Sequence, residues 1–134
     1  MLPQGTGPAA VTWASESLRR NSRVTVYTWL RVEDDPDEAR GLLQPVVHAW
    51  RDAGLYPNLV ARSGLTPAGG IELCELERVA IVGTPSQCAK QVMRLHCAGA
   101  SSVVLSPIGE DPEVQLERFS ADVLPLVLAD CMLS

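Results

Sequence analysis

The sequence predicts an α/β fold in which parallel strands alternate with flanking helices. Four helix starts place proline at the first helical position, where its missing N–H has no partner to lose. They lie at Gly7-Pro8, Asp35-Pro36, Thr84-Pro85 and Asp111-Pro112. The segment 23–32 between the first two is apolar on both alternating faces, which is typical of a parallel strand covered by helices on both sides. Repeated strand–turn–helix units of this kind indicate the α/β class.

The length and composition indicate one folded domain, which we expect to span 1–134. Apolar residues make up 46% of the 134 residues, enough for a core in a single domain of this size. No apolar run of about 18 residues exists, so no membrane partner is expected. Met1 is not followed by a basic and apolar leader, and a cytoplasmic location is therefore expected. The net charge of −5, with scattered arginines, disfavours a nucleic-acid partner.

The first half of the chain is predicted to contain two helices around one strand. A first helix from position 8 to about 20 would pack through Val11, Ala14 and Leu18. The helix after Asp35 has the clearest period, because its apolar residues fall on one stripe: Ala39, Leu42, Leu43, Val46, Val47, Trp50 and Ala53. Asp35 and Glu38 are spaced for reciprocal capping, and Gly54 is expected to end the helix in the left-handed conformation. Pro45 is expected to kink or split it.

The second half begins with a loop over 55–70, long for a connector and therefore suggestive of a lid or a binding loop. Segment 79–82 is expected to form either a third strand or an extended link. Thr84 and Gln87 form a capping box for a helix that ends at Gly99 and has these residues on neighbouring faces: Cys88, Ala89, Val92, Met93, His96 and Cys97. Segment 102–106 reads as a second strand covered on both faces. A last helix would use Leu116, Phe119 and Val123, with Pro125 disturbing its end.

Titratable and aromatic residues mostly suggest structural roles. The four cysteines (Cys74, Cys88, Cys97 and Cys131) contain no C-x-x-C pair and are interpreted as buried free thiols, so no metal site is predicted. We expect His48 at the surface and His96 at the buried face of its helix. Tyr27 and Trp29 are expected to pack in the core and Asp111 to be an N-cap. The run 33–35 is interpreted as a turn. Catalytic residues cannot be assigned from these patterns.

Two or three strands form a small parallel sheet whose edges would remain open. An open apolar edge pairs readily with another chain. The sequence therefore predicts either a homo-oligomer or a chain whose N-terminal half is supplied by further residues.

Segment 79–127 resembles the C-terminal end of the luciferase-like monooxygenases, a family of flavin- and deazaflavin-dependent (β/α)8 barrels. The motifs that carry the resemblance are the GTP helix start at Gly83-Thr84-Pro85, the AGA turn at Ala98-Gly99-Ala100 and the ERF…LPL helix over 117–126. The opening LPQGTGP over 2–8 and the stretch RVTVYTWLRVEDDPDEAR over 23–40 are also similar to the family's turn after strand six and its strand seven.

The resemblance implies a partial TIM-barrel-like fold, since a complete barrel has about 250 residues and this chain would hold about the last third to half. It also implies an oxidoreductase or monooxygenase that uses FMN or the deazaflavin coenzyme F-420 on a small-molecule substrate. In the family, most catalytic side chains lie on earlier strands, so this chain would hold few of them.

One candidate cofactor site follows from the same resemblance. Gly5, Thr6 and Gly7 combine a permissive backbone, a hydroxyl group and a helix start at Pro8, which suit a phosphate. They match a family turn beside the cofactor. The alternative is that the glycines form a tight turn and that Thr6 caps a helix.

Two functions therefore remain open at this point. The first is a luciferase-like oxidoreductase fragment that contributes to a flavin or deazaflavin site at the barrel rim. The second is a non-catalytic α/β remnant or oligomerising module that binds no cofactor.

Overall fold

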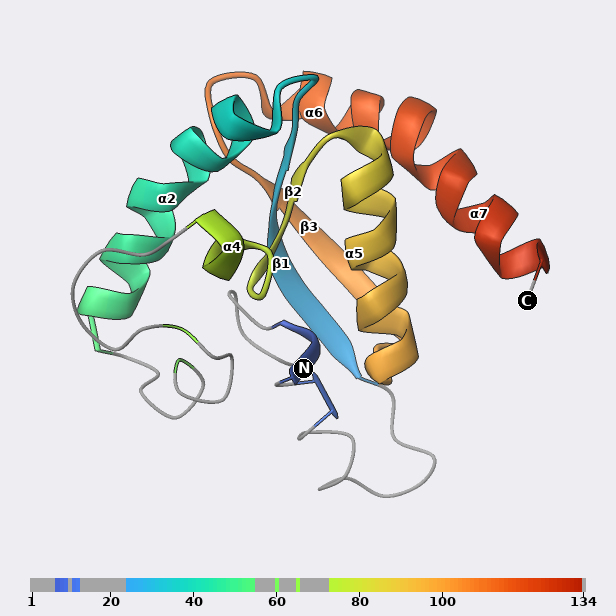
Figure 1. Ribbon diagram of the computed structural model, residues 1–134, viewed down its shortest axis with the longest axis horizontal. Helices are drawn as coiled ribbons and strands as arrows, with labels where there is room; N and C mark the ends of the chain where they lie inside the picture. Colours follow the sequence, from blue (N-terminus) through green and yellow to red (C-terminus); the bar gives the residue numbers. More distant parts are fainter. Residues whose placement is uncertain are drawn as a thin grey trace.

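The computed structural model describes residues 7–9, 11–12, 24–54, 60, 65 and 73–133. Within this part of the chain, three parallel strands form a sheet in the order β2-β1-β3 (Figure 1). The strands are β1 (Thr25–Val32), β2 (Ala80–Gly83) and β3 (Ser102–Pro107). The helices are α2 (Pro36–Asp52), α4 (Leu73–Leu76), α5 (Pro85–Ala98), α6 (Pro112–Arg118) and α7 (Leu124–Leu133), with a π-helical segment η1 (Phe119–Val123) between the last two. The predicted α/β class is confirmed.

Strand β1 lies at the centre and separates two apolar clusters, as its two apolar faces predicted. On one face, Trp29 packs with α2, α4 and the facing side chains of β2. On the other face, Val26 and Leu30 pack with α5, η1 and α7. Trp29 also meets Trp50 of α2 edge to face, with ring centroids 5.5 Å apart. The prediction that Trp29 packs in the core is confirmed, and Tyr27 is half-buried.

Asp35 is the N-cap of α2, as predicted, but its side chain bonds to the Asp37 N–H and not to the Glu38 N–H that a capping box uses. The Asp35 carboxylate accepts a hydrogen bond from the Asp37 N–H at 3.0 Å, and Gly54 has a φ of +70° just after the helix. The helix runs through Pro45 without a break, so the predicted split is wrong. Pro45 lies on the exposed side of the helix, where a lost backbone bond is least costly because water can replace it.

Helix α5 has the predicted ends and a different buried face. Thr84 and Gln87 form the capping box, and Gly99 ends the helix with a φ of +118°. The buried residues are Cys88, Ala89, Gln91 and Leu95. His96 and Cys97 are exposed, so their predicted burial is wrong. The buried face of α5 includes the polar residue Gln91 and excludes His96 and Cys97. A pattern of apolar residues alone cannot predict a buried glutamine, so it places the buried face at the wrong position around the helix.

Strand β3 and the helices after it are less covered than predicted. Ser102 and Val104 of β3 are exposed, so the expectation of two covered faces is wrong for this strand. Leu116 of α6 is 44% exposed, and Gln115 is buried in its place. Before Pro125 the helix widens into η1, where the Leu124 N–H bonds to the Phe119 carbonyl. A π turn of this kind adjusts the helix where proline removes a donor.

The parallel order agrees with one part of the barrel prediction and leaves the rest open. Strands β1 and β3 run side by side and parallel, from Thr25 opposite Ser102 to Leu30 opposite Pro107. Segment 79–82, which the sequence left as a strand or a link, contributes strand β2 on the other side of β1. No described helix is long and apolar enough to cross a membrane.

Two glutamine side chains take the place of missing strand partners. Gln91 of α5 accepts from the Val82 N–H at 2.6 Å and donates to the Val82 carbonyl at 2.8 Å, on the side of β2 that faces away from β1. Gln115 of α6 does the same for Val32 of β1, at 2.7 and 3.1 Å. Each amide therefore completes the hydrogen bonding of one buried strand residue.

We expect the substitution Gln91→Leu to lower the free energy of unfolding by about 1–3 kcal/mol, because the buried Val82 N–H and carbonyl would lose their partners. Urea unfolding followed by circular dichroism measures the change. Lys90→Leu, at the neighbouring exposed position of α5, is the control and should change stability by less than about 0.5 kcal/mol. Equal losses in the two variants would contradict the role of Gln91.

Candidate functional site at the carboxyl edge of the sheet

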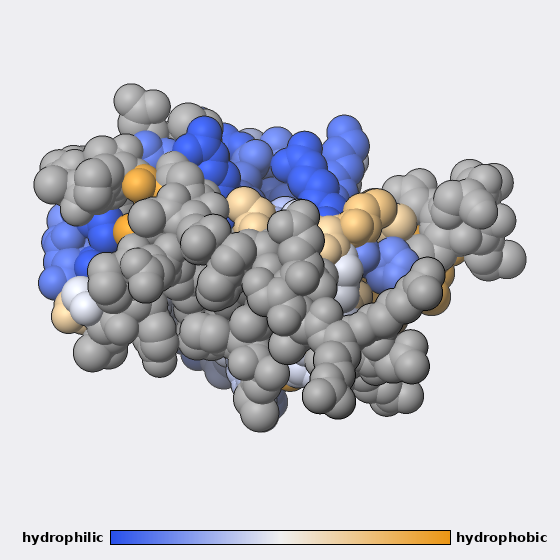
Figure 2. Space-filling view, turned by 90° about the horizontal axis from the view of Figure 1, so that it is seen from below, coloured by the Kyte–Doolittle hydropathy of each residue, from blue (hydrophilic) through white to orange (hydrophobic). Residues whose placement is uncertain are grey.

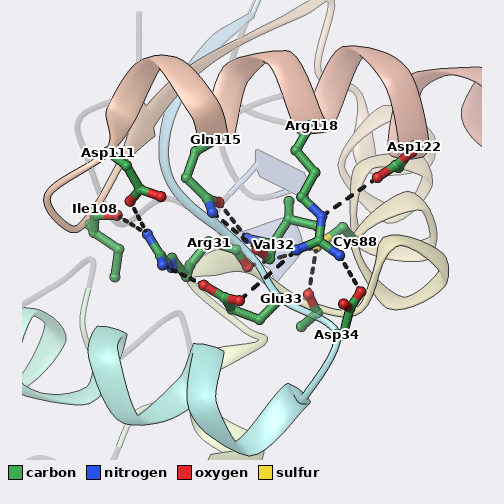
Figure 3. Close-up of polar contacts among 11 residues, drawn as sticks. Arg31, Val32, Glu33, Asp34, Cys88, Ile108, Asp111, Gln115, Arg118 and Asp122 are labelled. Carbon is green, nitrogen blue, oxygen red and sulfur yellow. Dashed lines mark hydrogen bonds and ion pairs between the residues drawn. The ribbon is translucent and has the colours of Figure 1, made fainter.

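The carboxyl ends of β1, β2 and β3 meet at one edge, where ligands usually bind in α/β folds. Above this edge, α6, η1 and the β3–α6 loop contribute charged side chains that meet those at the end of β1 and just after it (Figure 3). This edge cluster comprises Arg31, Glu33, Asp34, Asp111, Arg118 and Asp122. It is the largest group of interacting charges among the described residues, and it joins positions about 80 residues apart in the chain.

Arg31 lies at the centre of the edge cluster and is only 8% exposed. Its guanidinium group forms ion pairs with Glu33 and with Asp111, the latter at 2.8 Å, and donates to the Ile108 carbonyl at 3.0 Å. The Arg31 Nε is buried without a partner in the described part of the chain. Burial lowers the pKa of Arg31, but the hydrogen bonds to Asp111 and Glu33 outweigh it, so the pKa is raised. Arg31 therefore stays charged.

The loop between β3 and α6 is shaped around this arginine. Gly109 has a φ of +102°, and a Cβ atom at that position would lie 2.6 Å from Arg31 Nη1. Glycine is therefore required both by the backbone conformation and by the close approach of the guanidinium group. Asp111 is the N-cap residue of α6, as predicted, but its carboxylate bonds to Arg31 and makes no capping hydrogen bond.

Arg118 of α6 forms the second half of the edge cluster. It pairs with Asp34, with Asp122 at 3.5 Å and with Glu33 at 3.9 Å. Residues 33 and 34, interpreted from the sequence as a simple turn, therefore fasten α6 to the end of β1. Gln115 of α6 lies between Arg31 of β1 and Arg118 of α6, and its side-chain amide forms two hydrogen bonds with the backbone of Val32 (Figure 3).

The charge balance of the edge cluster does not suit an anionic ligand. Two guanidinium groups, on Arg31 and Arg118, face four carboxylates, on Glu33, Asp34, Asp111 and Asp122, which leaves a net charge of −2. Both arginines already have carboxylate partners, and a phosphate would have to displace them. As built, the edge cluster fixes the strand ends and α6 rather than offering a free anion site.

A buried thiol lies beneath the edge cluster. Cys88 Sγ lies 3.6 Å from the Gly83 carbonyl and 4.0 Å from the Arg31 carbonyl, close enough for weak S–H donation. Burial raises the pKa of the Cys88 thiol to about 12, despite the opposing effect of Arg118. The interpretation of Cys88 as a buried free thiol is confirmed, and a thiol of this pKa is a poor nucleophile.

The residues predicted to bind a cofactor lie elsewhere. Gly5 and Thr6 are outside the described residues. Gly7 is buried beside the amino end of β2, where a Cβ atom would lie 1.4 Å from the Arg78 carbonyl oxygen, and its own carbonyl accepts from the Val11 N–H at 3.0 Å. The cavity beside Gly7 and Pro8 has a volume of about 10 Å³, room for about one water molecule and too little for a phosphate.

Neither histidine has the surroundings of a catalytic base. His48 is 42% exposed and pairs with Asp52 at 2.9 Å on the surface of α2. His96 lies at the rim of an apolar pocket of about 260 Å³ between α5, β3 and the last helices. Among the described residues, no group of His, Cys, Asp and Glu side chains is arranged to hold a metal ion.

Sequence reasoning did not find Arg31, Gln115 or Arg118. The available signal was weak, because an arginine at an inward position of an otherwise apolar strand indicates only that a carboxylate must lie nearby. Comparison with protein-family models and with curated proteins finds no match for this chain.

The pKa of Cys88 predicts slow alkylation of this thiol in the native protein. We expect a maleimide to label the exposed Cys97 at least about a hundredfold faster than Cys88 at pH 8, and urea to abolish the difference. Peptide mass spectrometry after timed labelling measures both rates. Comparable native rates for the two thiols would show that Cys88 is not buried as described.

The Arg31–Asp111 pair predicts a pH-dependent contribution to stability. The hydrogen bond from Arg31 lowers the pKa of Asp111, so the folded state binds its proton less readily than the unfolded state does. Its contribution is present above the ordinary carboxyl pKa of about 4 and is lost as the pH falls through the lower folded pKa.

We therefore expect Asp111→Asn to lower the urea midpoint at pH 7 and to lower it progressively less below about pH 4. Glu110→Gln, at an exposed neighbouring position, should have little effect at any pH. A difference between wild type and Asp111→Asn that stays constant from neutral to acidic pH would contradict this assignment.

Proposed function

We propose that this chain is the C-terminal part of a luciferase-like oxidoreductase barrel, where it supplies the closing strands and helices of a flavin or deazaflavin enzyme. The proposal is supported by the positions of the motifs that carry the resemblance. Thr84 of the GTP motif caps α5, and Gly99 of the AGA motif ends it before β3. The ERF…LPL motif lies in the continuous helical segment α6–η1–α7.

The observation that carries the proposal is the parallel pairing of β1 with β3. The last two strands of a (β/α)8 barrel are parallel neighbours with helices on their outer side. In this chain β1 and β3 are parallel neighbours, although β2 and three helices (α2, α4 and α5) lie between them in the sequence. Helices cover both faces of β1, whereas a barrel has its helices on the outer face alone. A complete barrel would place its preceding strand against the edge of β1 that β2 occupies. The proposal therefore requires that, in the complete protein, β2 no longer pairs with β1 and the preceding barrel strand takes its place.

The described side chains do not fit the phosphate of such a cofactor. The edge cluster is negative and internally paired, and the cavity beside Gly7 is too small. A flavin or deazaflavin, when bound, carries the redox chemistry itself. We therefore assign no chemical step to the described residues, and binding of the cofactor would depend on the earlier strands and on Gly5 and Thr6.

The same charge balance favours a second candidate function. A carboxyl edge with paired charges and a net charge of −2 is suited to holding elements together. In a non-catalytic α/β module that assembles with a partner, the carboxyl edge has only this structural role and binds no ligand. The two candidates differ in one respect, which is whether a flavin binds once the remaining strands are present.

The test is to read the coding DNA upstream of Met1 and to express the longer protein. We expect an in-frame continuation with further strand–helix units, whose product binds FMN or F-420 with a dissociation constant below about 10 μM. The 134-residue chain alone should bind at least about tenfold more weakly. A longer protein that folds and binds neither cofactor, or a gene with no such continuation, would favour the second candidate.

Thr6→Val in the longer protein tests the predicted phosphate turn. We expect cofactor affinity to fall at least about tenfold, because a hydrogen bond to a charged group contributes about 1.5–3 kcal/mol. Ser86→Ala, at an exposed position of α5, is the matched loss of a hydroxyl group and should leave affinity unchanged. Unchanged affinity in Thr6→Val would remove Thr6 from the site.

A further inference from the structure

The two outer edges of the sheet differ in how far their backbone groups have hydrogen-bond partners. Gln91 occupies the outward side of β2 at Val82, and Gln115 occupies β1 at Val32, where β3 has diverged. No strand of the described part of the chain pairs with the outer edge of β3. Residues 102–106 carry no charge and the register shows no bulge, so the one feature of β3 that usually protects an edge strand from pairing is Pro107, at the last position of the strand.

The register shows which groups β3 turns outward. In a parallel ladder, alternate residues direct their N–H and C=O groups to opposite sides. Ser102 N–H donates to the Val24 carbonyl and Ile108 N–H to the Leu30 carbonyl, so the even-numbered residues of β3 face β1. Val103 and Leu105 therefore direct their backbone groups to the outer edge.

Apolar surface borders this edge on both faces of the sheet. On one face, Val103 and Leu105 line the pocket of about 260 Å³ together with Phe119 and Val127. On the other face, Val104 is 38% exposed. Seen from below, apolar atoms in tan and orange are visible near the centre and right of the view, and a few more at its left (Figure 2).

Helix α7 is also incompletely covered. Its sequence, LPLVLADCML, is apolar on nearly every side, and a helix of this composition is normally buried. Val127 is buried, yet Leu124, Leu126 and Leu128 are between 38% and 54% exposed. Val127 of α7 lines the same pocket as Val103 of β3, so α7 borders the apolar face of this strand.

We propose that, in the 134-residue chain, a second copy pairs with the outer edge of β3, the edge that the first strand of a complete barrel would occupy. The two β3 strands then run antiparallel across a two-fold axis at Val104. Val103 of each copy then lies opposite Leu105 of the other, and each such pair exchanges two backbone hydrogen bonds. Val104 meets its own counterpart as a non-hydrogen-bonded pair on the opposite face. The two sheets become one sheet of six strands.

A second copy fits this edge because the edge is complementary to itself. The outward-directed residues Val103 and Leu105 are placed symmetrically about Val104, and no charge opposes the pairing. The strand edge alone is small beside the roughly 800 Å² per partner that a stable interface buries. The exposed leucines of α7, the helix that shares the apolar pocket with β3, offer further apolar area.

Analytical ultracentrifugation of the 134-residue chain tests the assembly directly. We expect a dimer with a dissociation constant below about 10 μM. Val104→Lys should raise this constant at least tenfold, because two like charges would face each other directly. Val114→Lys, an equal change at an exposed position of α6, should leave it unchanged. A monomeric chain, or a dimer that Val114→Lys disrupts and Val104→Lys does not, overturns the proposal.

Cross-linking tests the geometry independently of stability. In a non-hydrogen-bonded antiparallel pair the Cα atoms lie about 4.5 Å apart, within disulfide range. In a Cys97→Ser background, which removes the exposed thiol among the cysteines whose burial the structure describes, Val104→Cys should form a disulfide-linked dimer on mild oxidation, and Val114→Cys should not. A folded Val104→Cys variant that stays monomeric on a non-reducing gel, as it would if a parallel strand of another protein occupied the edge, overturns the proposal.

Discussion

The backbone groups at the borders of a small parallel sheet are the constraint on which the rest of this fold depends. A three-stranded sheet buried between helices leaves N–H and C=O groups without strand partners, and each such group is costly if it remains unpaired. Gln91 and Gln115 meet this requirement at Val82 and Val32. Each helix is thereby fixed to a strand by two hydrogen bonds as well as by apolar contacts, which determines its height above the sheet.

The same constraint explains why the carboxyl edge is crowded with charges. Because β3 diverges from β1 after Pro107, α6 crosses the end of β1, and Gln115 fixes its position there. The ion pairs of Arg31 and Arg118 then hold α6 and the preceding loop. The carboxyl edge is thus committed to holding the fold together. For this reason, a redox function of this chain would depend on strands other than those described.

Much of the fold was predictable because its signals are local. Proline at helix starts, the Thr84–Gln87 capping box and the two apolar faces of β1 each depend on neighbouring residues, and all three are confirmed. The long-range features were not predictable. A buried glutamine, or an arginine inside a strand, shows in a sequence only as an exception to the apolar pattern, and its partner lies up to about 80 residues away. For this reason the sequence predicts a buried face of α5 that includes His96, whereas the structure buries Gln91 instead.

The most direct test of the central claim is amide hydrogen exchange, measured residue by residue by NMR. The strands that the structure describes offer no partner for the Val82 and Val32 N–H groups, which are bonded instead to the glutamine amides. We expect both to exchange as slowly as Ile81, which lies within the β1–β2 ladder. Exchange of Val82 and Val32 at the rate of exposed loop amides such as Glu110 would contradict this account of the fold.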